Sequence, residues 1–169
     1  MKPQIPTASK TIQAPAEIIY NLLADYRDGH PQILPKPYFL SMDVEQGGFG
    51  VGTIVRFQMR LLGRTQSFRS LITEPEPGRL LVETDIKSGI ATSFHVVPVD
   101  GNEHARLTIS TELKRRNVVE GFIAKMVLQK VYVQELELIA QYAEAKAQHD
   151  EPTQAKGRYT AATLNTSKR

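Results

Sequence analysis

The chain has 169 residues, of which 41% are hydrophobic and 23% charged, as is ordinary for a folded domain. It contains no cysteine, which excludes disulfides, thiolate zinc sites and cysteine nucleophiles. The net charge is +3. The basic residues are interspersed with acidic ones except at the Lys-Arg-Arg run 114–116, so we expect no nucleic-acid binding. No secretory signal is visible at the start and no stretch of about 18 apolar residues could span a membrane. We expect a cytoplasmic protein.

The first 37 residues predict one strand and two short helical segments. Residues 7–13 form an extended segment, and Pro15 suits the first turn of a helix because its missing N–H would have no partner there. Apolar residues then recur at helical spacing as Ile19, Leu22, Leu23 and Tyr26. Glycine and prolines interrupt residues 25–37, within which Ile33 and Leu34 indicate a helical turn.

A long β region follows. Residues 38–45, 52–61, 65–74, 79–85, 91–99 and 105–113 have strand character and are separated by short turns. The clearest alternation places Val55, Phe57 and Met59 on one side of a strand. Because connections this short join antiparallel neighbours, we expect one antiparallel sheet of seven strands. The glycine-rich segment 47–53 lacks phosphate-binding spacing, and we interpret it as a hairpin turn.

Residues 114–148 predict one long helix. Asn117 can cap it, and apolar residues including Phe122, Met126, Val133 and Leu136 recur along one stripe. The helix is the only element large enough to cover the apolar face of the sheet. Residues 149–169 show little periodicity, so we divide the chain into a ligand-binding domain (1–148) and a mobile C-terminal tail (149–169).

These elements predict an α+β fold in which the sheet curves around the last helix. Two short helices lie between its first and second strands. A helix cannot fill a concave sheet across its whole width, so an apolar cavity is expected between them. The alternative is a solid core in which side chains fill that space completely.

The order of several short motifs resembles one superfamily. The motifs are Ile12-Gln-Ala-Pro15, Leu22-Leu23-Ala24-Asp25-Tyr26, Ile33-Leu34-Pro35, the glycine-rich segment 47–53, Glu74-Pro-Glu-Pro-Gly78-Arg79, and the strand from Phe94 to Pro98. Together they make residues 6–148 similar to the START-like superfamily (SRPBCC, helix-grip fold), and in particular to its polyketide cyclase/dehydrase group. The resemblance implies binding of a hydrophobic small molecule such as a lipid, a polyketide or an aromatic compound. Only some members of this group catalyse a reaction.

No catalytic set can be assigned from the sequence. The candidates are Arg56, His95, His30 and Tyr26, but Arg56 and His95 also suit outward-facing charge pairs on the sheet. His30 lies near Asp25 and Asp28, which could form a metal or acid–base site or simply a turn. We expect no metal and no cofactor. The expected cavity wall, which would bind the ligand, consists of Tyr26, Leu34, Val55, Phe57, Met59, Phe68, Phe94, Phe122 and Met126.

The leading hypothesis is a carrier or sensor whose partner is a small hydrophobic molecule. A first alternative is a polyketide cyclase/dehydrase-type enzyme, which would need at least two polar groups in the cavity within hydrogen-bond reach of each other. A second alternative is a protein–protein interaction module, which a filled interior and a large exposed apolar patch would favour. The identity of the ligand, the oligomeric state and the role of the tail are left open.

Overall fold

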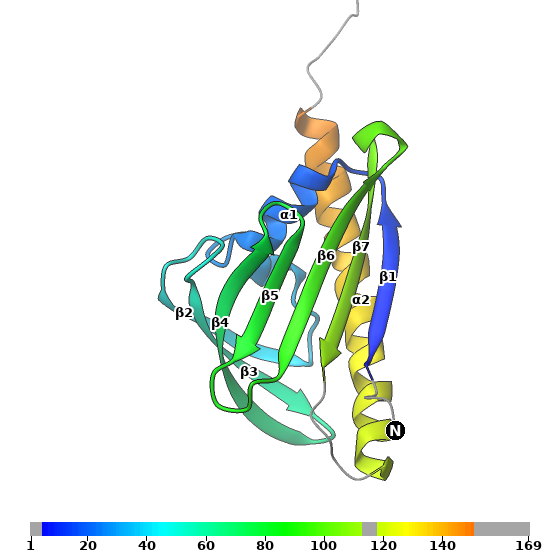
Figure 1. Cartoon of the computed structure of the whole chain (residues 1–169). Helices are drawn as coiled ribbons and strands as arrows, with labels where there is room; N and C mark the ends of the chain where they lie inside the picture. Colours follow the sequence, from blue (N-terminus) through cyan, green and yellow to red (C-terminus); the bar gives the residue numbers. More distant parts are fainter. Residues whose placement is uncertain (1–4, 113–117, 151–169) are drawn as a thin grey trace, which may run out of the picture.

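The computed structural model describes residues 5–112 and 118–150, with side chains described for all of these except 118–123 and 150. Within these ranges seven strands form one antiparallel sheet, and a long helix lies along one of its faces (Figure 1). The predicted helix-grip architecture is therefore confirmed. The elements are β1 (Thr7–Ile12), α1 (Ala16–Ala24), η1 (His30–Ile33), β2 (Phe39–Gln46), β3 (Ile54–Leu61), β4 (Arg64–Glu76), β5 (Leu80–Asp85), β6 (Ala91–Val99), η2 (Asp100–Asn102), β7 (His104–Glu112) and α2 (Val118–Asp150).

The strands are ordered β1-β7-β6-β5-β4-β3-β2 across the sheet. Strands β2 to β7 form a meander, and β1 pairs with β7 at the far edge. The turn between β2 and β3 is the glycine-rich segment, where Gly48 has φ +135° and donates its N–H to Thr53 Oγ1 at 3.0 Å. The positive φ of Gly48 and its hydrogen bond to Thr53 belong to a hairpin turn, as the sequence predicted.

The alternation within strands decides which side chains face α2. In β3, Val55 and Phe57 are buried while Arg56 between them is exposed. In β7, Leu107 and Ile109 are fully buried. The period-two pattern of the sequence therefore gives one apolar face, as expected for an antiparallel sheet with one solvated side.

Helix α2 buries a stripe whose members recur every three or four residues: Val131, Tyr132, Glu135, Leu136, Ile139, Ala140 and Ala143. It approaches β1, α1 and η1 most closely. The predicted stripe was partly wrong, because Met126 and Val133 are 46% and 53% exposed. Apolar residues occur on more than one side of this helix, and the contact with β1 selects the face that is buried.

Several expectations, among them the helix cap Asn117, fall on residues that lie outside the described ranges. The proposed tail corresponds mostly to residues 151–169, which lie outside the described residues, whereas His149 still belongs to α2. The Lys-Arg-Arg run 114–116 and the side chain of Phe122 also lie outside them. Within the described ranges, no helix is both long and apolar enough to cross a membrane.

Candidate functional site

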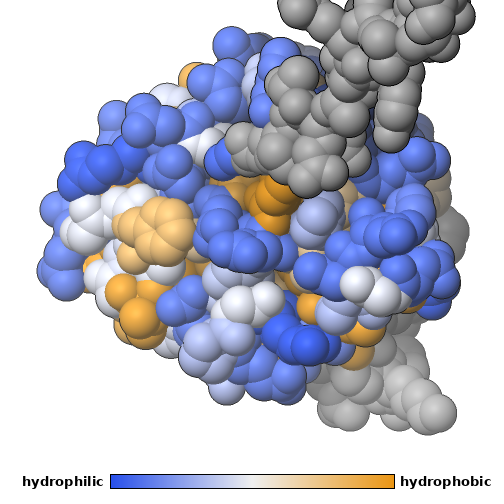
Figure 2. All heavy atoms as spheres, turned by 90° about the horizontal axis from the view of Figure 1, so that it is seen from above, coloured by the Kyte–Doolittle hydropathy of each residue, from blue (hydrophilic) through white to orange (hydrophobic). Residues whose placement is uncertain are grey.

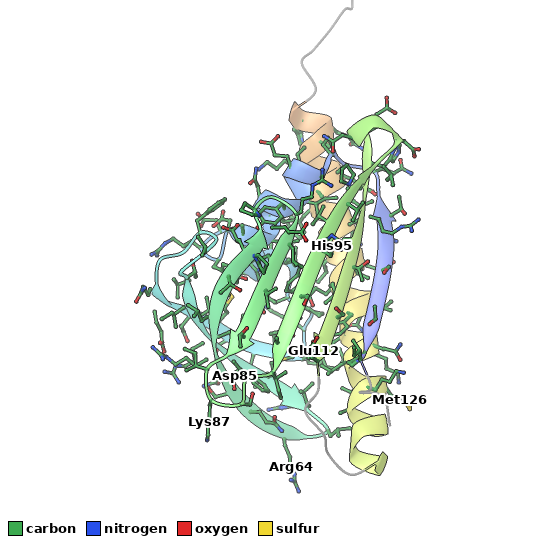
Figure 3. All side chains as sticks on the ribbon, in the orientation of Figure 1. Arg64, Asp85, Lys87, His95, Glu112 and Met126 are labelled. Carbon is green, nitrogen blue, oxygen red and sulfur yellow. The ribbon has the colours of Figure 1, made fainter. Side chains whose placement is uncertain are left out.

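A cavity of about 840 Å³ lies between the sheet and α2. Its apolar wall includes side chains from η1's end, three strands and the helix, namely Leu34, Phe39, Phe57, Met59, Phe94 and Val131. Its rim includes the exposed Arg64 and Lys87, which stand at the lower edge of the sheet in Figure 3. The cavity therefore has an open end near the β3–β4 and β5–β6 turns, and an inner part covered by helices.

The first buried polar group of the inner part is His30, whose side chain is 1% exposed. Its Nδ1 lies 2.7 Å from the carbonyl oxygen of Leu23, and a carbonyl only accepts, so Nδ1 carries the hydrogen. The ring stacks on Tyr26 with centroids 4.5 Å apart and an interplanar angle of 16°. These contacts fix the imidazole so that Nε2 faces Glu83 Oε1 at 3.5 Å.

Glu83 on β5 accepts a second contact, from the Tyr26 hydroxyl at 2.7 Å. The Glu83 side chain is 11% exposed and lines the cavity. Burial raises the pKa of this carboxyl, while the His30 charge and the Tyr26 hydrogen bond lower it. Glu83, His30 and Tyr26 thus form a buried polar cluster that joins β5 to the segment at the end of α1 and the start of η1.

Glu135 is a second buried carboxyl group, contributed by α2 and 3% exposed. It lines the same cavity, and no hydrogen bond to its carboxyl is found within the part of the chain that the structure describes. Burial, followed by the charge of Glu83, raises the pKa of Glu135 well above its usual value. Burial and the Glu83 charge thus favour the protonated form of Glu135.

Hydroxyl groups complete the inner polar surface. Tyr132, one turn before Glu135 on α2, is hydrogen-bonded to Thr111 on β7. Thr111 in turn pairs with Thr92 on β6 at 2.7 Å between hydroxyl oxygens. Burial raises the pKa of Tyr132, so its phenol stays neutral. All three side chains line the cavity.

Asp85 lies closer to the rim and has a structural role. Its carboxylate accepts hydrogen bonds from the backbone N–H and the hydroxyl of Ser88, at 2.7 and 2.6 Å, and from the Arg69 N–H at 2.9 Å. Burial raises the pKa of Asp85, but these hydrogen bonds outweigh it and the net shift is downward. Asp85 thus organises the β5–β6 turn.

The structure brings many of the predicted wall residues together. Leu34, Phe57, Met59, Phe68 and Phe94 line the cavity. Tyr26 and Val55 are fully buried but lie behind the lining residues. Met126 is exposed on α2, pointing away from the sheet in Figure 3, which removes it from the cavity wall.

Two of the four candidate catalytic residues lie outside the cavity. Arg56 is exposed and pairs with Glu45 at 2.5 Å, next to Arg69, which binds the same carboxylate. His95 lies on the exposed face of β6 (Figure 3), between the inward-facing Phe94 and Val96. The hypothesis of an inward-facing Arg56 or His95 is therefore corrected, because strand alternation directs both to the outer face.

The other two candidates, His30 and Tyr26, belong to the buried cluster. The alternative metal site with Asp25 and Asp28 does not form: Asp25 Oδ1 accepts the N–H groups of Arg27 and Asp28, both at 3.1 Å, which is turn chemistry. Among the described residues no group of three or more His, Asp or Glu side chains is placed to hold a metal ion.

Sequence reasoning identified neither Glu135 nor Glu83 as a site residue. The signal for Glu135 was its position within the spacing Val131, Glu135, Ile139, which places a carboxyl on the buried stripe of α2. The signal for Glu83 was its position two residues from Leu81, which shares its face.

A seven-stranded antiparallel sheet gripping one long helix over a cavity defines the helix-grip, START-like class of proteins. Within that class the chain belongs to the polyketide cyclase/dehydrase and lipid transport family, whose model matches residues 5–144. No match is found among curated proteins.

Solved structures support the fold. The KanY protein superposes with a TM-score of 0.75 at 19% identity, covering 85% of this chain and 99% of that one. A START superfamily protein from Mycobacterium smegmatis gives 0.68 at 14% identity, covering 84% and 98%. The Zhui aromatase/cyclase from Streptomyces sp. R1128 gives 0.69 at 17% identity, covering 86% and 96%. At these identities the similarity establishes the architecture alone.

Proposed function

We propose that the protein binds a small, largely apolar molecule in the cavity between the sheet and α2, as a carrier or a sensor. The observation that carries the proposal is the cavity itself, since about 840 Å³ falls within the range of small-molecule pockets. Its aromatic and aliphatic wall would otherwise be in contact with water, at a cost of about 25 cal/mol per Å² of apolar surface. A ligand that covers this wall recovers that free energy.

The surface argues against the interaction-module alternative on the face that Figure 2 displays. Seen from above, the coloured residues are mostly hydrophilic, and the hydrophobic areas are small and separate. The interior is also hollow, whereas an interaction module was expected to have a filled one. Both observations favour a ligand inside over a partner on this face.

The test begins with native mass spectrometry of the protein purified from its own host, in which a co-purifying small molecule is expected. An apolar fluorescent probe then reports on the cavity directly. Phe57→Arg, which places a charge on the wall, is expected to abolish probe binding, while the outward-facing neighbour variant Gln58→Arg leaves it unchanged. Equal binding by both folded variants would reject this cavity as the binding site.

A second candidate function, a cyclase-type enzyme, is favoured by one specific observation. The cavity contains a proton acceptor cluster, His30 with Glu83, and a buried protonated carboxyl, Glu135. General acid–base chemistry on an enolisable chain needs a proton donor and an acceptor facing the same substrate. The test is turnover of a short linear poly-β-ketone. An enzyme would form the cyclised product above the background rate, and Glu83→Gln would lower kcat more than ligand affinity.

A further inference from the structure

The inner part of the cavity is rich in hydrogen-bond acceptors and poor in fixed positive charge. Glu83 and Glu135 lie there, together with the hydroxyl oxygens of Thr111 and Tyr132. The lysine and arginine side chains among the described lining residues are Lys87 and Arg64, both exposed at the rim. An anionic head group would therefore be attracted to the rim and repelled from the inner part.

The two inner carboxyl groups differ in what surrounds them. Glu83 is contacted by the Tyr26 hydroxyl and by His30, so its carboxyl already has partners within the protein. Glu135 is 97% buried, given its 3% exposure, and within the described residues no hydrogen bond reaches it. Its side chain lines the cavity, so a ligand there can supply the carboxyl with a hydrogen-bond or ionic partner and offset part of the cost of removing it from bulk water.

A protonated amine satisfies this environment better than a neutral acceptor does. An ammonium group has three donors and no acceptor, whereas a carbonyl would use only the single proton of Glu135 and leave the other oxygens unpaired. An ammonium also gains from the charge of the Glu135 carboxylate once its proton is released, and an aromatic side chain of the cavity lining such as Tyr132 or Phe94 can stabilise a cation nearby.

We infer that the cavity takes a ligand with an apolar body and a protonated amine, and that the amine binds Glu135 while the body lies on the aromatic wall. This inference rests on the proposed function and specifies the chemical class of its ligand. Glu135 transfers its proton to solvent when the cation binds, so that the inner part of the cavity changes from neutral acid to ion pair.

The experiment compares four probes of similar length on the unaltered protein by isothermal titration calorimetry: decylamine, decanol, 2-undecanone and decanoate. Decylamine is expected to bind at least tenfold more tightly than decanol, and decanoate to bind most weakly. In protein labelled with ¹³C at glutamate carboxyls, decylamine is expected to move the Glu135 signal to the carboxylate position. Both measurements use the unaltered sequence, so neither result depends on whether a variant folds.

The variant Glu135→Gln keeps the shape of the side chain but cannot ionise. It is expected to lose the preference for decylamine and to bind decanol within about twofold of the unaltered protein. Glu137→Gln is the matched control, because Glu137 lies on the same helix but is exposed and pairs with Lys10. It should retain the preference.

The outcomes separate the two proposals. If decanol and decylamine bind equally, or 2-undecanone binds most tightly, the amine inference is overturned and the apolar cavity remains. If Glu135→Gln retains the preference, or Glu137→Gln loses it, the assignment to Glu135 is wrong. If none of the four probes binds, both the amine inference and the proposed function are rejected.

Discussion

The buried carboxyl of Glu135 predicts an unusual dependence of stability on pH. Burial and the charge of Glu83 raise its pKa in the folded state, while the unfolded chain returns it to about 4.3. Between those two values the folded protein holds a proton that the unfolded chain releases. The contribution of Glu135 to stability is therefore intact below pH about 4.3, and it is lost as the pH rises toward the folded-state pKa.

The magnitude follows from proton linkage. One proton of difference between the two states corresponds to about 1.4 kcal/mol of unfolding free energy per pH unit. The variant Glu135→Gln has no proton to release, so its stability relative to the unaltered protein is expected to rise by about 1.4 kcal/mol per unit above pH about 5. The difference stops growing once the pH passes the folded-state pKa of Glu135.

The assay is urea unfolding at pH 4, 5, 6 and 7, with the slope in urea checked for constancy so that midpoints reflect stability. The exposed variant Glu137→Gln is the control and should show a small difference from the unaltered protein that hardly changes with pH. A difference between Glu135→Gln and the unaltered protein that is flat across this range, or that falls as the pH rises, would refute the claim that burial raises the pKa of Glu135.

Three further predictions concern packing, the polar cluster and the glycine turn. Phe57→Ala should lower the free energy of unfolding by about 3–5 kcal/mol, against less than about 1 kcal/mol for the exposed Leu71→Ala; similar losses in denaturant unfolding would contradict the assigned faces. Tyr26→Phe should lower the free energy of unfolding by about 1.5–3 kcal/mol at neutral pH, because Glu83 loses a hydrogen bond. An unchanged urea midpoint would count against that contact. Gly48→Ala should lower the free energy of unfolding by about 1–3 kcal/mol, since the φ of +135° at this position strains any residue with a Cβ. A thermal midpoint within about 1 °C of that of the unaltered protein would show that the turn relaxes to accept the Cβ.

Much of the fold was predictable because local patterns and short connections determine it. The alternation of Val55, Phe57 and Met59 identified both β3 and its inward face. Short turns required antiparallel neighbours, and one long helix was the sole cover available for an apolar sheet. These inferences need only periodicity and connection length.

The buried face of α2 was harder to predict. Residues such as Met126, Val133 and Tyr142 are apolar but exposed, so the sequence offers several overlapping stripes. The face is selected by contacts with β1, α1 and η1, which are distant in the sequence. Propensity and periodicity do not contain that information.

The polar part of the site was harder still. Strand β5 begins Leu80-Leu81-Val82, and three apolar residues in a row hide the phase that directs Glu83 inward. Glu135 has acidic neighbours in the sequence such as Glu137, so the sequence predicts that it belongs to a solvent-exposed face of the helix. Only the three-dimensional arrangement shows that these two carboxyl groups face the same cavity.

One geometric cause connects the cavity with the position of the Glu135 carboxyl. Helix α2 packs most closely on the edge strand β1 and on α1 and η1, so it leaves the inner face of β3 to β5 uncovered. Glu135 lies on the side of the helix that faces this gap, where no hydrogen bond from a described strand residue to its carboxyl is found. Larger side chains in this gap would pack the core more completely but would leave no room for a ligand. The same substitution, Glu135→Gln, is therefore expected to make the protein more stable near neutral pH and a poorer binder of amines, which is the trade-off expected where a site is maintained against stability.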